Sequence, residues 1–436
     1  GNYTLAATTA QGAGTITRRT LTVGTVAAQT KTYDGTRAAD AAAFRATLDN
    51  VVAGEENSVT ATATGAAYND KNVARANTVS YTGVALTGTG AGNYTIATTA
   101  EGTGTITPRA LTLGAVAAQS KTYDGTRAAD ASKFHAALGN AVAGDNVTAA
   151  AAGATYNDKN VARANRIDYT GVALAGADAG NYSLAATTAQ GTGTITPRTL
   201  TVGTVAAQTK IYDGNTSADA AKFRATLSNF VAGEEGSATA TAAGAAYNSK
   251  DVAQANAVSY TGVSLTGTGA ANYTVANTAE GAGAITKLAL TVGAVTAQTK
   301  TYDGTTAADA AAFHATLGNV VAGEENSVAA TAASASYNDK SVAGANTVSY
   351  TGVALTGTGA GNYAVADTAQ GAGTITKRAL TLGEVTAQTK TYDGTTAADA
   401  SKFRAALGNT VEGDNVTAAA TTATFNDKNV AAANRI

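Results

Sequence analysis

The acidic and amide side chains that could bind a cation recur along this chain in segments of similar sequence. Carboxylate and amide oxygens are ligands of Ca²⁺, so Asp34, Asn69 and Asp70, or Asp34 with Glu55 and Glu56, are the candidates for a calcium site. No stretch has the alternating acidic ligands and central glycine of a compact calcium loop. The sequence therefore favours a structural role for these residues and predicts no bound metal.

The sequence gives little indication of a catalytic site. The two histidines, His135 and His314, occupy a position that holds arginine in three other copies of the same segment, which is typical of an exposed site and not of a catalytic base. Serines have no histidine that recurs beside them, so a hydrolytic triad is not indicated. The glycine run at 88–93 lacks the Lys-Ser/Thr of a phosphate-binding loop. We expect no enzyme and no cofactor.

The element that recurs most clearly is Tyr-Asp-Gly. Tyrosine favours a strand, aspartate can accept hydrogen bonds from nearby backbone N–H groups, and glycine permits positive φ, so the motif predicts a strand that runs into a tight turn. It occurs five times, at Tyr33, Asp34, Gly35; Tyr123, Asp124, Gly125; Tyr212, Asp213, Gly214; Tyr302, Asp303, Gly304; and Tyr392, Asp393, Gly394.

These motifs define a period of about 90 residues, which is long enough for a unit to bury a core of its own. Two further motifs recur with the same period. One is Gly-Asn-Tyr or Ala-Asn-Tyr, and the other is Tyr-Asn-Asp or Tyr-Asn-Ser. We expect a folded bead from each copy, with one strand ending at Ile106 and the next starting near Arg109. The predicted boundaries are 1–15 for the tail of a preceding repeat, 16–105, 106–194, 195–284 and 285–374 for repeats 1 to 4, and 375–436 for an incomplete repeat 5.

Within a repeat, the pattern favours β structure. Residues 78–88 and 93–107 are rich in Thr, Tyr, Val and Ile, as pleated strands are. The segment 40–50 differs, because Asp40 can cap a helix while Phe44 and Leu48 lie four residues apart on one helical face. The predicted fold is mainly β (α+β), a tandem array in which each bead is an antiparallel sheet with one short helix; the alternative is a helix-free β-sandwich.

Composition limits the partners. Of 436 residues, 44% are hydrophobic and only 14% charged, with a formal charge of -2, so no basic face exists to neutralise nucleic-acid phosphates. There is no cysteine, and no apolar run long enough to span a membrane. The absence of Met even at position 1 leads us to expect an internal piece of a longer protein.

The motifs ITPRALTL, KTYDGT, VAGDNVTA, YNDKNVA and YTGVALAGADAGNYSL, found between Ile106 and Leu184, together resemble the YDG domain. This repeat is similar to the glycine-rich MBG repeats of large bacterial surface and two-partner-secreted adhesins related to filamentous haemagglutinin. The resemblance covers the whole chain. It implies an exported, mostly β stalk or adhesive segment, extracellular or at the bacterial cell surface, without catalytic residues.

Two functions remain open. The repeats are a spacer or fibre that projects another domain or builds a biofilm matrix, or each repeat is a glycan- or protein-binding adhesive module in which Tyr81 and Tyr94 stack on sugars. Near-identical copies, few charges and absent linkers favour the spacer. The possible partners are neighbouring copies of the chain in a fibre, or host or matrix glycans and proteins. Burial of the two tyrosines would remove the best residues of the binding module.

Overall fold

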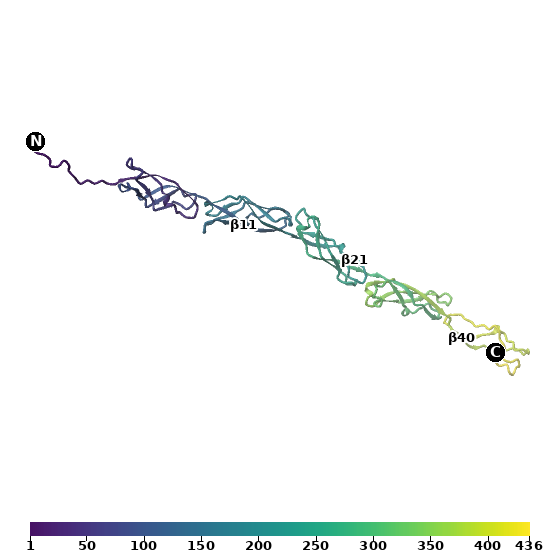
Figure 1. The fold of residues 1–436 in the computed structure, drawn as a ribbon. Helices are drawn as coiled ribbons and strands as arrows, with labels where there is room; N and C mark the ends of the chain where they lie inside the picture. The colour runs from purple at the N-terminus through teal and green to yellow at the C-terminus, as the bar shows by residue number, and fades with distance from the viewer. The chain divides into compact units, whose positions relative to one another are not determined.

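A computed structural model describes all residues, 1–436. It forms two compact units, one made of 1–200 with 229–239 and 265–274, the other of 201–228, 240–264 and 275–436. The division passes through repeat 3, not between two repeats. The same β architecture returns along the chain in Figure 1, where β11 marks repeat 2, β21 repeat 3 and β40 repeat 5.

Repeat 1 is built from short strands and two single 3₁₀ turns. In chain order these are β1 (Arg19–Thr20), β2 (Thr22–Val26), β3 (Gln29–Thr32), η1 (Ala41–Ala43), β4 (Ala46–Asp49), β5 (Thr60–Thr62), β6 (Gly65–Tyr68), β7 (Thr78–Thr82), β8 (Ala85–Thr87), η2 (Ala91–Asn93), β9 (Tyr94–Thr95) and β10 (Thr99–Thr107). One four-stranded sheet has the order β3-β10-β7-β6, and three two-stranded ladders pair β2 with β4, β5 with β8 and β1 with β9.

Repeat 2 follows the same plan from Arg109, directly after Pro108. Its elements are β11 (Arg109–Thr122), η3 (Ala131–Lys133), β12 (Ala136–Gly139), β13 (Thr148–Ala150), β14 (Gly153–Tyr156), β15 (Arg166–Thr170), β16 (Ala173–Ala175), η4 (Ala179–Asn181), β17 (Tyr182–Leu184) and β18 (Thr188–Thr196). Here β11 is one long strand where the other repeats have separate pieces.

Repeats 3 and 4 repeat the order of repeat 1. Repeat 3 contains β19 (Arg198–Thr199), β20 (Thr201–Val205), β21 (Gln208–Ile211), η5 (Ala220–Lys222), β22 (Ala225–Ser228), β23 (Thr239–Thr241), β24 (Gly244–Tyr247), β25 (Ala257–Thr261), β26 (Ser264–Thr266), η6 (Ala270–Asn272), β27 (Tyr273–Thr274) and β28 (Thr278–Thr286). Repeat 4 contains β29 (Leu288–Ala289), β30 (Thr291–Val295), β31 (Gln298–Thr301), η7 (Ala310–Ala312), β32 (Ala315–Gly318), β33 (Ala329–Thr331), β34 (Ser334–Tyr337), β35 (Thr347–Thr351), β36 (Ala354–Thr356), η8 (Ala360–Asn362), β37 (Tyr363–Ala364) and β38 (Thr368–Thr376). The last repeat contains β39 (Thr381–Val385), η9 (Ala400–Lys402) and β40 (Ala405–Gly408).

The prediction of a mainly β fold is confirmed, in its helix-free form, and the predicted helix at 40–50 is wrong. Asp40 does accept a hydrogen bond from the Ala42 backbone N–H, but the helix stops after the single 3₁₀ turn η1. Phe44 then leaves helical geometry, with ψ of 119°, and its buried ring packs on Tyr81 with centroids 4.6 Å apart. A helix as short as one over 40–50 would be only marginally stable. The backbone of β4 instead forms hydrogen bonds with β2.

The expectation of a purely antiparallel sheet is also wrong. β10 pairs in parallel with β3, from Gly104 opposite Gln29 to Thr107 opposite Thr32, and antiparallel with β7. Parallel neighbours need a long connection, and here nearly the whole repeat lies between β3 and β10. In repeats 1 to 4 a strand segment near the start of the repeat therefore lies beside the strand that ends it.

The core of repeat 1 lies on one face of this sheet. Tyr68, Val79 and Tyr81 are each at most 1% exposed. Their bulk is possible because β10 presents Gly104 opposite them. A Cβ at Gly104 would lie 2.6 Å from Val79 Cγ2 and 2.9 Å from Tyr68 Cε1, so no larger residue fits without displacing the core. None of the helical turns is long or apolar enough to cross a membrane.

Candidate functional site

The Tyr-Asp-Gly turn is organised by a lysine. β3 ends at Thr32, immediately before the motif, and Gly35 has a φ of +82°. Asp34 Oδ1 accepts hydrogen bonds from Lys31 Nζ at 2.7 Å and from the Thr36 backbone N–H at 2.9 Å. Burial opposes ionisation of Asp34, but the hydrogen bonds from Lys31 and Thr36 hold its pKa below the ordinary value. Lys31 also donates to two backbone carbonyls and lies 5.4 Å from the centre of the Tyr68 ring.

Tyr33 points out of its own repeat and into the next one. Its side chain is fully buried, and its hydroxyl donates to Asp145 Oδ2 at 2.8 Å. The hydroxyl of Tyr182 donates to the same oxygen at 2.6 Å, and the two rings meet edge to face with centroids 5.3 Å apart. Val142 of repeat 2 covers Gly35, where a Cβ would lie 2.8 Å from Val142 Cγ1. Two tyrosines and one carboxylate thus join the repeats.

A second contact uses the other two motifs. The loop 69–77 of repeat 1 is closed by Asn69, which accepts from the Asn77 and Thr78 backbone N–H groups. The backbone N–H of Val73 in this loop donates to Asn181 Oδ1 at 2.9 Å, and Asn181 Nδ2 donates to Asn72 Oδ1 at 2.9 Å. Asn181 is 5% exposed. The asparagine of Gly-Asn-Tyr therefore accepts a hydrogen bond from the backbone of the preceding repeat.

The junction between repeats 2 and 3 has the same plan with glutamate as the acceptor. Tyr123 donates to Glu234 Oε1 at 2.7 Å and Tyr273 donates to Glu234 Oε2 at 2.7 Å, with the rings 5.4 Å apart. Val161 N–H donates to Asn272 Oδ1 at 2.9 Å. Burial raises the pKa of Tyr123, and its hydrogen bond to Glu234 adds to the shift, so the phenol stays protonated and donates.

The junction between repeats 3 and 4 repeats this arrangement. Tyr212 and Tyr363 each donate to Glu324 at 2.7 Å. Val252 N–H donates to Asn362 Oδ1 at 2.8 Å. Burial, followed by the hydrogen bond to Glu324, raises the pKa of Tyr363 to about 12.

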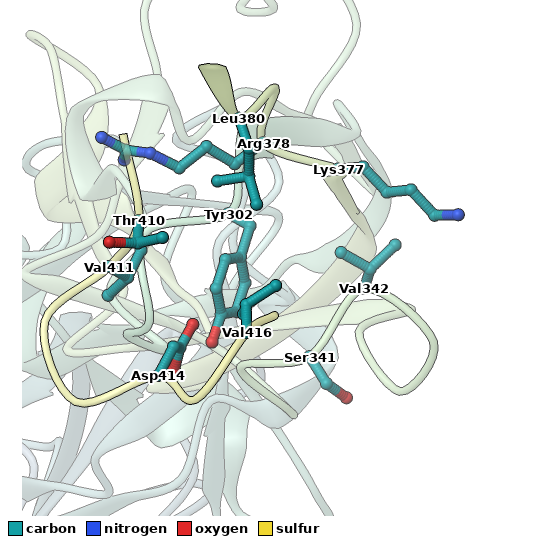
Figure 2. Close-up of a pocket in the computed structure, with 10 residues that line it drawn as sticks. All are labelled: Tyr302, Ser341, Val342, Lys377, Arg378, Leu380, Thr410, Val411, Asp414 and Val416. Atoms are coloured by element: carbon teal, nitrogen blue, oxygen red, sulfur yellow. The ribbon is translucent and has the colours of Figure 1, made fainter. Parts of the chain in front are cut away.

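Between repeats 4 and 5 lies a pocket whose lining includes Tyr302, Leu380, Asp414 and Val416. Tyr302 pairs with Asp414, and the hydrogen bond to this carboxylate raises the pKa of Tyr302. Figure 2 shows Tyr302 standing beside Asp414 with the apolar side chains of Leu380 and Val416 near its ring. The sequence 375–436 contains no Gly-Asn-Tyr segment.

The candidate calcium ligands are not brought together in one site. Asp34 is held by Lys31 and Thr36, while Asp70 Oδ1 accepts from the Asn72 backbone N–H at 2.8 Å within its own turn. Glu56 accepts from the Gly54 backbone N–H at 2.9 Å, and Glu55 from the hydroxyl of Tyr94. Each of these four carboxylates therefore accepts at least one hydrogen bond from a protein donor.

The remaining candidates have structural positions. His135 and His314 are exposed, and Nδ1 of His314 lies 3.3 Å from the carbonyl of Ala312 two residues before it. Tyr81 is 0% exposed and Tyr94 only 4%, so neither ring is available to stack on a sugar. The binding module loses the two tyrosines on which it depended.

The acceptors of the junctions, which are Asp145, Glu234, Glu324 and Asp414, are not among the residues predicted from the sequence. A usable signal was present: each acceptor follows the tyrosine of the Tyr-Asp-Gly motif in its own repeat by 22 residues.

Both the fold and the site define a tandem array of small β repeats that are joined directly to one another. The YDG domain model matches residues 17–101, 107–189, 196–280, 286–370 and 376–436. The chain belongs to the YDG domain family. A search of curated proteins finds no match.

Solved structures offer only distant likenesses. Drosophila N-cadherin EC1-4 aligns at 10% identity over 82% of this chain and 100% of its own, with a TM-score of 0.22. Immunoglobulin domains 1–5 of Sidekick-1 align at 8% identity over 81% of this chain and 80% of theirs, with a TM-score of 0.22. Surface layer protein SbsC, domains 4–9, aligns at 11% identity over 90% and 71%, with a TM-score of 0.15. Scores this low support no argument about fold or function.

Proposed function

We propose that this chain is a non-enzymatic structural repeat region, a stalk or spacer that holds other parts of a large bacterial adhesin or matrix protein away from the cell. The observation that carries the proposal is the tyrosine–carboxylate–tyrosine contact between consecutive repeats. It recurs at the first three junctions and uses residues that each repeat presents in the same register.

The junctions favour stiffness over free motion between neighbouring repeats. Only Pro108 separates β10, which ends at Thr107, from β11, which starts at Arg109, so there is no flexible linker. The core of repeat 1 includes Leu111 and Tyr182 of repeat 2. Bending at this point would expose buried apolar surface and leave the hydroxyl of Tyr33 without its acceptor, which costs free energy.

The same contacts support a role without catalysis or a cofactor. The acidic residues of each Tyr-Asp-Gly turn and of each junction accept hydrogen bonds from protein donors, as Asp34 and Asp145 do. An extracellular or surface location and a role in adhesion or in a biofilm matrix follow from the resemblance to YDG and MBG-like repeats of bacterial adhesins, and belong to the proposal.

Small-angle scattering of the whole chain tests the spacer. The nine-residue β10 spans about 30 Å at roughly 3.3 Å per residue. Four such repeats with two end pieces would give a maximum dimension of roughly 150 Å. A maximum dimension near 70 Å, about that of a compact globule of this mass, would contradict the spacer. Saturable binding on a glycan array that scales with repeat number would favour an adhesive module in its place.

A further inference from the structure

The chain enters and leaves repeat 2 on two strands that lie side by side. It enters on β11, one strand of 14 residues, and leaves on β18. The two strands pair in parallel, from Val116 opposite Gly191 to Thr122 opposite Thr196. Because both strands point the same way, the point of entry at the start of β11 and the point of exit at the end of β18 lie at opposite ends of the ladder.

This arrangement determines how tension acts on the repeat. A pull on the two ends of the chain draws β11 and β18 past each other along the strand direction, so the hydrogen bonds between them are loaded together. Antiparallel neighbours would place entry and exit at the same end, and the same pull would then open the bonds one after another. Bonds that must break together raise the barrier to unfolding, and this barrier sets the rate of forced unfolding.

Both strands are held by further partners. Most of β11 is paired, with β17 at 109–111, with β12 between Thr112 and Val116, and with β18 from Val116 to Thr122. β18 is paired on both sides, in parallel with β11 and antiparallel with β15. Neither strand lies at an edge of the sheet, whose order is β12-β11-β18-β15-β14. Neither can be drawn out of the repeat without sliding along its partners.

The β11–β18 ladder is covered on one face and cross-linked on the other. On the covered face, Ile195 is 1% exposed and a Cβ at Gly193 would lie 2.9 Å from Tyr156 Cε1. On the other face, the hydroxyl of Thr196 donates to the carbonyl of Lys121 at 3.3 Å. The same bond from leaving to entering strand recurs in the other complete repeats, from Thr107 to Lys31, Thr286 to Lys210 and Thr376 to Lys300.

The lysine before Tyr-Asp-Gly ties the entering strand to the far side of its sheet. Lys121 donates to the carbonyls of Thr126 and Ala128, both at 2.9 Å. Ala128 in turn forms a bridge with Thr155 of β14, the strand at the opposite edge. Lys31 and Lys300 make the corresponding pair of bonds in repeats 1 and 4. The end of the entering strand is therefore anchored from two directions.

The other complete repeats have the same entry and exit. There the entering segment is divided into shorter strands, but its last strand pairs in parallel with the leaving strand over four residue pairs: β3 with β10, β21 with β28, and β31 with β38. At the first three junctions a single residue separates the leaving strand from the next entering strand, namely Pro108, Pro197 and Lys287. Tension therefore passes from one repeat directly into the next.

We propose that the chain bears tension, and that the parallel pair of entering and leaving strands is the element that resists it in each repeat. This function goes beyond that of a spacer, because a spacer has only to keep two points apart and need not withstand a pull on its ends. The lysine of the Lys-Thr-Tyr-Asp-Gly segment then has a second role besides the turn, since it fixes the strand on which the pull enters.

Single-molecule force spectroscopy of the whole chain tests the proposal, since the absence of cysteine lets introduced pairs define the points of attachment. Ala115→Cys with Thr196→Cys places the handles at opposite ends of the β11–β18 ladder. Ala115→Cys with Thr188→Cys places both at the same end. All three side chains are exposed. At equal loading rate, unfolding between opposite ends should need roughly twice the force or more, because only that pull loads the bonds together.

The comparison changes the direction of the pull and keeps the fold, so the two double variants should have the same melting temperature. Ala294→Cys with Thr376→Cys or with Thr368→Cys, all at exposed positions, repeats the experiment in repeat 4 and removes any dependence on how repeat 2 tolerates substitution. Equal forces for the two directions in either repeat, or a lower force between opposite ends, would overturn the proposal. Such a result would leave the scattering test of the spacer unaffected.

Discussion

The first and second junctions perform the same task with different carboxylates. At the first, the hydroxyls of Tyr33 and Tyr182 both reach Oδ2 of Asp145. At the second, Tyr123 reaches both oxygens of Glu234, Tyr273 reaches Oε2, and Lys159 Nζ lies 3.5 Å from Oε1. The longer side chain therefore makes room for a third partner.

Loop length accounts for the choice of acid. Four positions separate Gly144 from the start of β13 at Thr148, and six separate Gly233 from the start of β23 at Thr239. The short loop carries aspartate directly after glycine and the long loop carries glutamate. Two residues fewer keep every later side chain on its own face of the strand. The two junctions therefore share the tyrosine pair and differ in the length of the loop and in the acid that it carries.

The largest effect is expected from removing the tyrosine of Tyr-Asp-Gly. Tyr33→Ala deletes a fully buried ring and should lower the free energy of opening of the first junction by about 3–5 kcal/mol. Hydrogen-exchange mass spectrometry of peptides that contain Val73 measures this opening. The matched control is Tyr392→Ala, since Tyr392 has the same motif but is 58% exposed. Equal losses in both variants would show that the ring supports its own repeat and not the junction.

Exchanging the acids tests whether each loop requires its own carboxylate. Glu234→Asp should leave at least one of the two tyrosine hydroxyls without an acceptor and cost about 2 kcal/mol at the second junction. Asp145→Glu should strain the shorter loop of the first junction by a similar amount. The measurement is the same hydrogen exchange, read at Val161 for the second junction and Val73 for the first. If neither Glu234→Asp nor Asp145→Glu changes the hydrogen exchange at its junction, loop length does not select the acid.

Acid should weaken the glutamate junctions. Burial opposes ionisation of Glu234, but hydrogen bonds from Tyr273 and Tyr123 and the charge of Lys159 hold its pKa below the ordinary 4.5. A group with a lowered pKa in the folded state contributes stability that is present above its ordinary pKa and is lost as pH falls through the folded value. Wild type should therefore lose its advantage over Glu234→Gln between about pH 5 and pH 3.

Calorimetry at several pH values follows this loss. At pH 7 the variant should melt slightly earlier, because a hydrogen bond to a neutral amide is weaker than one to a carboxylate, by about 1 kcal/mol. A difference in melting temperature that persists unchanged at pH 3 would contradict the assignment to Glu234.

The smallest effect is expected from the lysines. Lys159 is 49% exposed in its ion pair with Glu234, so Lys159→Ala should cost less than about 0.5 kcal/mol and the cost should vanish in high salt. Lys250→Ala should behave in the same way at the third junction, where Nζ lies 2.9 Å from Glu324. Lys71→Ala is the control, because the aspartate junction shows no such ion pair. A salt-dependent loss in Lys71→Ala would erase the distinction between the two kinds of junction.

Local sequence determined the period, the β class and the turn at Tyr-Asp-Gly. Each depends on residues that lie close together in the chain: the strand preference of threonine and tyrosine, the hydrogen-bonding reach of Asp34, and the positive φ open to Gly35. The segment 40–50 was misread because a capping aspartate and two apolar residues four apart favour a helix locally. Burial of Phe44 against Tyr81 and pairing with β2 decide for a strand.

Only the tertiary structure decided what the repeated motifs are for. The partner of Tyr33 is Asp145, 112 residues away, and the partner of Val73 is Asn181, 108 residues away. No local pattern can show that a tyrosine at the end of one strand will leave its own repeat and be buried in the next. The reason is that burial depends on the surface a neighbour offers, and this surface exists only once two repeats have folded side by side.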